Sequence, residues 1–233
     1  HVFSSLPKYA AGKPPTPVEG LKQYKLSSNE NPHGPIPEVA RILAEFDATH
    51  RYPDPLSTKL RTALAHRLGV DAHNIVTGAG SLGALNQILK AFAGASLDGT
   101  QDEVIYAWRS FEAYPILVGL LGAKSVQIPN LPNGAHDLNA MAQAVTDRTR
   151  VILVCTPNNP TGPAVTEAQM REFLTKIPEN VVVVIDEAYY EFCTASTVPA
   201  GQNAPVNGLN LLNDHPNVIV LRTFSKAQGL AGL

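Results

Sequence analysis

The amino-acid sequence predicts an α/β protein built as a three-layer sandwich, in which helices cover both faces of a mostly parallel β-sheet. The first observation behind this class is a regular alternation of predicted strands and helices. From Asn74 onward, short apolar runs alternate with amphipathic helical stretches, as in chains that form parallel sheets. The second is composition, since a chain of 233 residues that is 44% hydrophobic and 16% charged has enough apolar side chains for a large core.

The apolar runs predict six strands, and the stretches around them predict helices. The expected strands are residues 75–77, 103–107, 125–128, 151–155, 181–185 and 218–221. The expected helices are residues 37–46, 56–68, 82–93, 112–121, 138–145 and 166–176. Thr166 and Gln169 form the pattern of a capping box, and Gly69 is placed to end a helix. Segment 194–213 is rich in proline, glycine and asparagine, and is expected to be a long loop at the edge of the site.

Residue types that bind ligands follow five of the six predicted strands. In open α/β sheets, ligands bind outside the carboxyl ends of the strands, so these residues are expected to line one site. They are Gly80, Ser81, Phe111, Asn158, Asn159, Asp186 and Lys226.

Lys226 is the central residue of this candidate site. It follows the predicted strand 218–221, and two hydroxyl residues, Thr223 and Ser225, precede it. Hydroxyls and free backbone N–H groups at the exit of a strand bind phosphate. A partly desolvated amine beside a phosphate is suited to Schiff-base formation. The pattern therefore predicts the lysine of a pyridoxal phosphate site, whereas an isolated lysine is usually a solvated surface residue.

Asp186 ends the apolar run 181–185, where burial of an unpaired carboxylate is costly. A protonated pyridine nitrogen would compensate the charge, and the carboxylate would keep that nitrogen protonated. Tyr189 and Asn159 are candidates for hydrogen bonds to the phenolate oxygen of the ring, and Phe111 is a candidate for its face. Each residue also has a purely structural interpretation, which is strand capping for Asp186 and core packing for the aromatic side chains.

A dinucleotide site is one alternative, because residues 78–83 match G-x-G-x-x-G. A dinucleotide-binding fold has an acidic residue at the end of the next strand, whereas Asp102 and Glu103 stand at the start of theirs. The same glycines at a helix N-terminus suit a single phosphate, with Gly80 and Ser81 as its ligands, or simply a tight turn.

A serine hydrolase is the second alternative. Residues 79–83 approximate the G-x-S-x-G nucleophile elbow around Ser81, and Asp186 and His215 follow in the order of a catalytic triad. The first glycine of that motif is Ala79 here, and His215 precedes a strand instead of following one.

Charge and cysteine content narrow the class of partner. The net charge of −2 and the pI near 6.4 give no basic surplus for a nucleic acid or an anionic membrane. No metal site is expected, because the histidines and the two cysteines, Cys155 and Cys193, lack metal-ligand spacing. Two cysteines make no disulfide framework, and the sequence shows neither a membrane span nor an export signal, so we expect a cytoplasmic protein.

The expected domain organisation is an N-terminal arm, residues 1–28, followed by one large domain, residues 29–233. Residues 13–17 read Lys-Pro-Pro-Thr-Pro, which excludes helix and is typical of an arm that crosses a surface. Arms of this kind often reach a partner subunit.

Several motifs together resemble the fold-type I pyridoxal phosphate aminotransferases, in the branch of histidinol-phosphate aminotransferase. The resemblance runs from Leu26 to Leu233. The matching stretches are residues 28–32 (Ser-Asn-Glu-Asn-Pro), 51–53 (Arg-Tyr-Pro), 80–81 (Gly-Ser), 156–162 (Thr-Pro-Asn-Asn-Pro-Thr-Gly), 186–189 (Asp-Glu-Ala-Tyr) and 223–227 (Thr-Phe-Ser-Lys-Ala). The fold it implies is the large domain of the pyridoxal phosphate-dependent transferases.

The resemblance implies a role for each site residue. Lys226 is the implied catalytic residue and binds the cofactor covalently, while Asp186 pairs with the pyridinium nitrogen. The other implied cofactor ligands are Gly80, Ser81, Thr223 and Ser225 at the phosphate, Asn159 and Tyr189 at the ring hydroxyl, and Phe111 on the ring face. Tyr52 of the neighbouring subunit is implied to complete the phosphate site, so a homodimer is expected.

The implied reaction moves an amino group from an aromatic amino acid or histidinol phosphate to 2-oxoglutarate. Residues 108–115 depart from the Pro-Thr-Tyr pattern of histidinol-phosphate enzymes and resemble the aromatic amino acid (phenylalanine) aminotransferases of the same branch. Gln228 stands where an aromatic residue is usual. The family continues beyond Leu233 with a phosphate-binding arginine and a small C-terminal domain, which we expect to be absent from this chain. An amino acid decarboxylase of the same branch and an inactive, truncated cofactor-binding domain stay open as alternatives.

Overall fold

The computed structural model describes residues 6–7, 12–193 and 204–233, which form two compact units. Unit 1 consists of His1–Tyr9 and Ser81–Thr223, and unit 2 of Ala10–Gly80 and Phe224–Leu233. Within the described residues, no helix is long and apolar enough to cross a membrane.

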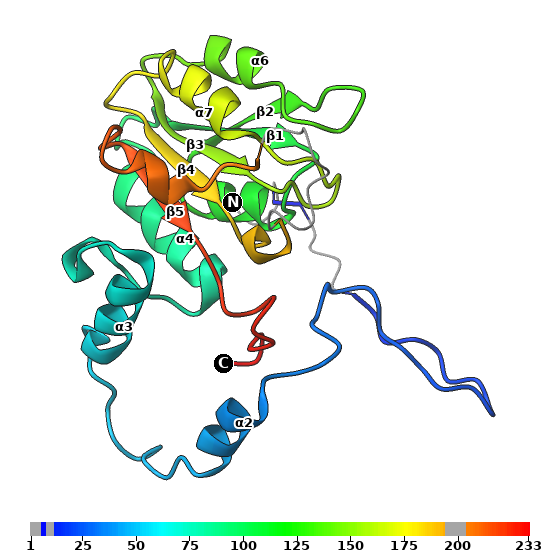
Figure 1. Cartoon of the computed structure of the whole chain (residues 1–233). Helices are drawn as coiled ribbons and strands as arrows, with labels where there is room; N and C mark the ends of the chain where they lie inside the picture. The colour runs from blue at the N-terminus through cyan, green and yellow to red at the C-terminus, as the bar shows by residue number, and fades with distance from the viewer. Residues whose placement is uncertain (1–5, 8–11, 194–203) are drawn as a thin grey trace. The chain divides into compact units, whose positions relative to one another are not determined.

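Unit 1 is organised around a five-stranded parallel sheet with the strand order β2-β1-β3-β4-β5 (Figure 1). The strands are β1 (Glu103–Trp108), β2 (Lys124–Pro129), β3 (Thr149–Cys155), β4 (Val182–Asp186) and β5 (Val218–Leu221). Neighbouring parallel strands need crossover connections, and the helices between them supply these connections. Five of the six predicted strands are therefore confirmed.

Helices cover both faces of this sheet, so the predicted three-layer sandwich is confirmed (Figure 1). One face carries α4 (Gly80–Phe92) and α5 (Ala113–Leu120), and the other carries α6 (Leu138–Gln143) and α7 (Glu167–Leu174). The capping box at the start of α7 is present, because the Thr166 side chain accepts from the Gln169 N–H and the Gln169 side chain accepts from the Thr166 N–H.

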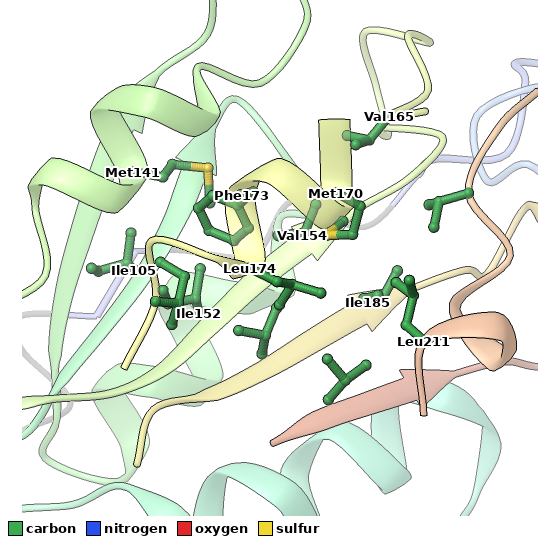
Figure 2. Close-up of a cluster of buried hydrophobic side chains, with 14 of the residues drawn as sticks. Ile105, Met141, Ile152, Val154, Val165, Met170, Phe173, Leu174, Ile185 and Leu211 are labelled. Atoms are coloured by element: carbon green, nitrogen blue, oxygen red, sulfur yellow. The ribbon is translucent and has the colours of Figure 1, made fainter. Parts of the chain in front are cut away.

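Alternating strand residues build two separate layers of core. Val104 and Tyr106 point toward α4 and α5, whereas Ile105 between them points toward α6 and α7. The second layer is drawn in Figure 2, where Met141 of α6 and Phe173 of α7 pack above the strands. Each fully buried apolar side chain of this kind contributes roughly 1.5–3 kcal/mol, so the two layers fix the sheet and hold the carboxyl ends of its strands in place.

Unit 2 contains the helices α2 (Pro37–Ala44) and α3 (Thr58–Leu68) and a short 3₁₀ segment, η1 (Ala72–Asn74). Arg61 of α3 ties these last two together, since its guanidinium donates two hydrogen bonds to the Ala72 carbonyl at 3.0 and 2.7 Å. Gly69 ends α3 in the left-handed conformation, with φ of 69°, as its position in the sequence predicts.

Three predicted elements differ from the structure. Residues 75–77 do not form a strand in the described part of the chain, because a short apolar segment becomes a strand only beside a partner strand. The helix expected from residue 56 begins at Thr58, because the Asp54 carboxylate binds the N–H groups of Leu56 and Thr58 and holds a turn there. Residues 208–211 of the expected long loop form a 3₁₀ helix, η3 (Gly208–Leu211), and residues 194–203 lie outside the described residues.

Candidate active site

The carboxyl ends of three neighbouring strands, β3, β4 and the edge strand β5, meet in register. Asp186, the last residue of β4, pairs with Cys155 at the end of β3 and with Leu221 at the end of β5. The Asp186 carbonyl also accepts the Thr156 N–H at 2.9 Å. The edge at which the sequence predicts a ligand site is thus a connected part of unit 1, with a carboxylate at its centre.

Asp186 is buried, with 4% of its surface exposed. The Tyr114 hydroxyl donates to its Oδ2 at 2.7 Å, and the Ala188 N–H donates to its Oδ1 at 3.2 Å. Burial raises the pKa of Asp186, and these two hydrogen bonds oppose the rise. Both donors are neutral, so a cationic ligand atom is the group that would compensate the carboxylate charge.

Phe111 contacts Tyr114, the residue that donates to this carboxylate. The two rings meet edge to face with their centroids 5.6 Å apart, and the Tyr114 N–H donates to the Phe111 carbonyl at 3.0 Å. The sequence analysis singled out Phe111 and missed Tyr114. The only signal for Tyr114 in the sequence is its position, three residues after Phe111.

The loop that carries Asn159 is held by its neighbour Asn158, which is buried. Asn158 Oδ1 accepts from the Ser110 hydroxyl at 2.7 Å, and its Nδ2 donates to the Arg109 carbonyl at 3.0 Å and the Thr161 hydroxyl at 2.7 Å. The first asparagine of the Asn-Asn-Pro motif therefore anchors the loop, and the second, Asn159, is half-buried.

The sequence neighbours of Asp186 and Thr223, which are Glu187 and Arg222, form an ion pair. Glu187 is wholly buried and accepts from the Arg222 guanidinium, and its other oxygen accepts the Gly208 N–H at 2.6 Å. The guanidinium also lies over the Tyr190 ring, 4.1 Å from its centroid. Burial raises the pKa of Glu187, and the Gly208 N–H and the charge of Arg222 oppose the rise.

Three further predicted ligands belong to unit 1, namely Ser81, Tyr189 and Thr223. Ser81 lies in the first turn of α4, whose N–H groups are available to an anion, and not in a turn ahead of the helix as expected. Thr223 is buried and follows β5 by two residues, and Tyr189 is half-buried and follows Asp186 by three. The role of Ser81 as a phosphate ligand stays a prediction.

The remaining predicted residues, Gly80, Tyr52, Ser225 and Lys226, belong to unit 2. Gly80 has φ of 61°, a conformation that favours glycine, at the first residue of α4. Tyr52 is fully exposed, and Ser225 and Lys226 are half-buried.

A folded turn carries Lys226. The Gly229 N–H donates to the Lys226 carbonyl at 3.1 Å, and the Leu230 N–H donates to the Phe224 carbonyl at 3.0 Å. The Asn31 side chain donates to the Ala227 carbonyl at 2.9 Å, which ties the turn to the predicted Ser-Asn-Glu-Asn-Pro motif. Two stretches that lie 196 residues apart in the sequence therefore form one part of unit 2.

The serine hydrolase alternative is wrong. Asp186 stands at the carboxyl end of β4 and pairs with Leu221, whereas His215 precedes the amino end of β5 at Val218. The three residue-to-residue steps from Val218 to Leu221 alone span about 10 Å of extended strand, so His215 lies at the opposite edge from the carboxylate. A triad needs the carboxylate on the histidine, and here the carboxylate is bonded to Tyr114.

Comparison with known proteins agrees with this geometry. The histidinol-phosphate aminotransferase of Sinorhizobium meliloti, solved in complex with pyridoxal 5′-phosphate, superposes with a TM-score of 0.74 at 32% identity, over 88% of this chain and 53% of that one. The aromatic amino acid aminotransferases of Streptomyces coelicolor and Thermobifida fusca are 49% and 50% identical over 99% of this chain. An L-threonine-O-3-phosphate decarboxylase of Porphyromonas gingivalis, 22% identical with a TM-score of 0.66, shares the fold alone.

The sheet, its covering helices and the buried carboxylate define the large domain of a pyridoxal phosphate-dependent transferase of fold type I. The chain belongs to the family described as aminotransferase class I and II, whose model matches residues 22–233. The dinucleotide alternative is thereby excluded. The chain spans about three fifths of the length of the curated relatives it matches, 61% of both relatives named above.

Proposed function

We propose that the protein is a pyridoxal phosphate-dependent aminotransferase that moves an amino group from an aromatic amino acid to a 2-oxo acid such as 2-oxoglutarate. The single observation that carries this proposal is Asp186. A buried carboxylate with two neutral donors, set at the carboxyl end of a central strand, is matched to a protonated heteroaromatic nitrogen.

The residues present fit the cofactor at each of its polar groups. Asp186 holds the pyridine nitrogen, while Asn159 and Tyr189 donate hydrogen bonds to the ring hydroxyl. The phosphate ligands are Gly80, Ser81, Thr223 and Ser225, of which Ser81 adds the free N–H groups of a 13-residue helix. Phe111 would cover the ring face, and Tyr114 holds the Phe111 side chain through an edge-to-face contact.

Bound pyridoxal phosphate supplies an electron sink for the bond to be broken at the substrate Cα. The protein contributes the charges that this sink needs. Asp186 would hold the proton of the ring nitrogen, and Lys226 would bind the cofactor. The Lys226 amine would also take the proton from the substrate Cα as general base and return it as general acid.

The aromatic donor is favoured over histidinol phosphate by two observations. The relatives with 49–50% identity are named aromatic amino acid aminotransferases, whereas the histidinol-phosphate enzyme is 32% identical. In addition, residues 108–111 begin with Trp108, over whose ring the Arg109 guanidinium lies at 4.9 Å. Residues 108–115, which include this pair, depart from the Pro-Thr-Tyr pattern of the histidinol-phosphate branch.

We also propose that the protein works as a cytoplasmic homodimer. The fully exposed Tyr52 supports a dimer, since it is the residue that the resemblance assigns to the partner's phosphate site. The helices α2 and α3 have no buried residue of their own, which leaves their apolar side chains available to another chain. Cys155 and Cys193 are both free thiols, as in a reducing compartment.

The absorption spectrum of the protein with pyridoxal phosphate tests the proposal. We expect a visible band from the lysine-bound cofactor that bleaches when phenylalanine is added and returns with 2-oxoglutarate. Lys226→Ala should abolish the band, whereas Lys176→Ala, which changes an exposed lysine paired with Glu172, should leave it intact.

Asp186→Asn separates cofactor binding from chemistry. The variant is expected to keep the band but lose about a hundredfold or more in turnover, because the ring nitrogen loses its charged partner. A wild-type rate in this variant would refute the role of Asp186. Release of carbon dioxide from phenylalanine would identify a decarboxylase, a stable band without bleaching would identify an inactive binding domain, and absence of any band would refute the cofactor assignment.

A further inference from the structure

We propose that Tyr114 is a positioning residue that keeps the Asp186 carboxylate ionised, and thereby keeps the shared proton on the ring nitrogen of the bound cofactor. The inference rests on the proposed function and adds to it a residue that the sequence motifs do not contain. It starts from one contact, the 2.7 Å hydrogen bond from the Tyr114 hydroxyl to Asp186 Oδ2.

The Tyr114 ring is fixed, so its hydroxyl has one direction to point. Its side chain is wholly buried. Tyr106 packs against the ring from one side, with centroids 5.6 Å apart and planes at 67°, and Phe111 packs against it at the same centroid distance with planes at 85°. Because the buried ring is packed between these two aromatic side chains, the hydroxyl is presented to Asp186 before any ligand arrives.

Chemistry assigns the direction of the hydrogen bond. An ionised carboxylate only accepts, so the phenol must donate. Burial and then the charge of Asp186 raise the pKa of Tyr114 well above its ordinary value, and the phenol therefore keeps its proton. A second titratable group beside Asp186 is the Cys155 thiol, whose pKa is raised to about 12 by burial and by the charge of Asp186, so it also stays neutral.

The consequence for the cofactor follows from competition for one proton. Burial raises the proton affinity of Asp186, while the hydroxyl of Tyr114 and the N–H of Ala188 lower it. The lower the proton affinity of the carboxylate is, the more the proton stays on the pyridine nitrogen. Without the Tyr114 hydroxyl, the proton moves toward Asp186, the ring nitrogen loses positive charge, and the electron sink weakens.

Tyr114→Phe tests this inference, because it removes one oxygen and keeps the ring. The chain offers a matched control in Tyr106→Phe, since Tyr106 is also wholly buried in the same aromatic cluster but its hydroxyl is bonded to Gln127 at 3.1 Å. Both variants lose a buried hydroxyl, and only one of them loses a contact to Asp186.

The primary readout is the nitrogen-15 NMR shift of the ring nitrogen in holoprotein loaded with labelled pyridoxal phosphate. In Tyr114→Phe we expect this signal to move toward the unprotonated position, with kcat lowered about ten- to hundredfold and KM changed less than about twofold. The Tyr106→Phe protein should keep the wild-type signal and rate.

The outcomes separate this inference from the proposed function. If the wild-type protein binds no pyridoxal phosphate, the proposed function fails. If the wild-type protein binds it with a protonated ring nitrogen and Tyr114→Phe shows the same signal and rate, the proposed function stands and the role of Tyr114 is refuted. An equal loss in both variants would mean that Tyr114 acts only through packing, which also refutes the inference.

Discussion

Two guanidinium nitrogens of Arg222, Nε and Nη2, lie 2.9 and 2.8 Å from the same oxygen of the Glu187 carboxylate. Each residue of this buried pair is the sequence neighbour of a candidate cofactor ligand. Glu187 follows Asp186 at the end of β4, and Arg222 precedes Thr223 at the end of β5. One ion pair therefore fixes the spacing between the residue assigned to the ring nitrogen and a residue assigned to the phosphate.

Removal of the Glu187 charge should be costly. Glu187→Ala leaves the Arg222 guanidinium, whose side chain is 22% exposed, without its main partner, and the Gly208 N–H without its acceptor. Since breaking a buried pair costs about 3–5 kcal/mol, we expect a loss of that order in the free energy of unfolding. Urea unfolding measures it. Glu172→Ala, which breaks the exposed pair with Lys176, should cost less than about 1 kcal/mol, and equal losses in the two variants would contradict the prediction.

Gly208 lies too close to its neighbours to carry a side chain. A Cβ at this position would stand 2.7 Å from Val220 Cγ2 and 3.3 Å from Glu187 Oε1. Because valine has little rotational freedom, Gly208→Ala should destabilise the protein by about 1–3 kcal/mol in thermal or urea unfolding. Gly94→Ala is the control, since its nearest neighbour, the Leu121 carbonyl, is 3.9 Å away. A Gly208→Ala protein as stable as the control would contradict the prediction, because it would show that η3 moves to accommodate the added methyl group.

Glu103 should make unit 1 sensitive to acid. Burial alone would raise its pKa, but hydrogen bonds from Thr146, Lys124 and Arg148 outweigh burial and lower the pKa from 4.5 to about 2. A carboxyl group with a lowered pKa in the folded state stabilises the protein above pH 4.5, and this stabilisation is lost as the pH falls toward 2. We expect roughly 2–3 kcal/mol of stability to disappear over that interval.

Glu103→Gln should flatten this acid dependence, because the variant has no proton to take up at that position. Unfolding free energies measured between pH 5 and about pH 2 test the prediction. The control is Glu179→Gln, which removes a carboxylate from the exposed surface of the same unit. A slope in Glu103→Gln that equals the wild-type slope would assign the acid sensitivity to other carboxyl groups.

Local signals in the sequence predicted the elements well. Strand β5 has the predicted bounds, Val218–Leu221, because an apolar run between turn residues is a short-range pattern. The capping box of Thr166 and Gln169 is equally local. The error at residues 75–77 has the opposite cause, since whether an extended segment becomes a strand depends on a partner elsewhere in the chain.

Only the residues proposed to contact the ligand were predictable from the sequence, and the residues that hold them in place were not. Asp186 was singled out correctly as a buried carboxylate at a strand end, because an acidic residue after five apolar ones is visible in the sequence. Its donor Tyr114 stands 72 residues away, and the Ser110–Asn158 contact spans 48 residues. Such pairs are set by sheet order and helix crossing, which no local pattern encodes. The ligand roles assigned to the individual residues stay predictions.

Strand β3 has a neighbour on each side and side chains that are buried from Val151 to Cys155. Its amide protons are therefore out of reach of solvent until the sheet itself opens. In deuterated buffer they should be among the last to exchange, at a rate that reports global unfolding rather than local fluctuation. Since β3 ends beside Asp186, the same slow protons make a probe of how tightly a bound ligand locks the sheet, through the added protection that ligand binding gives.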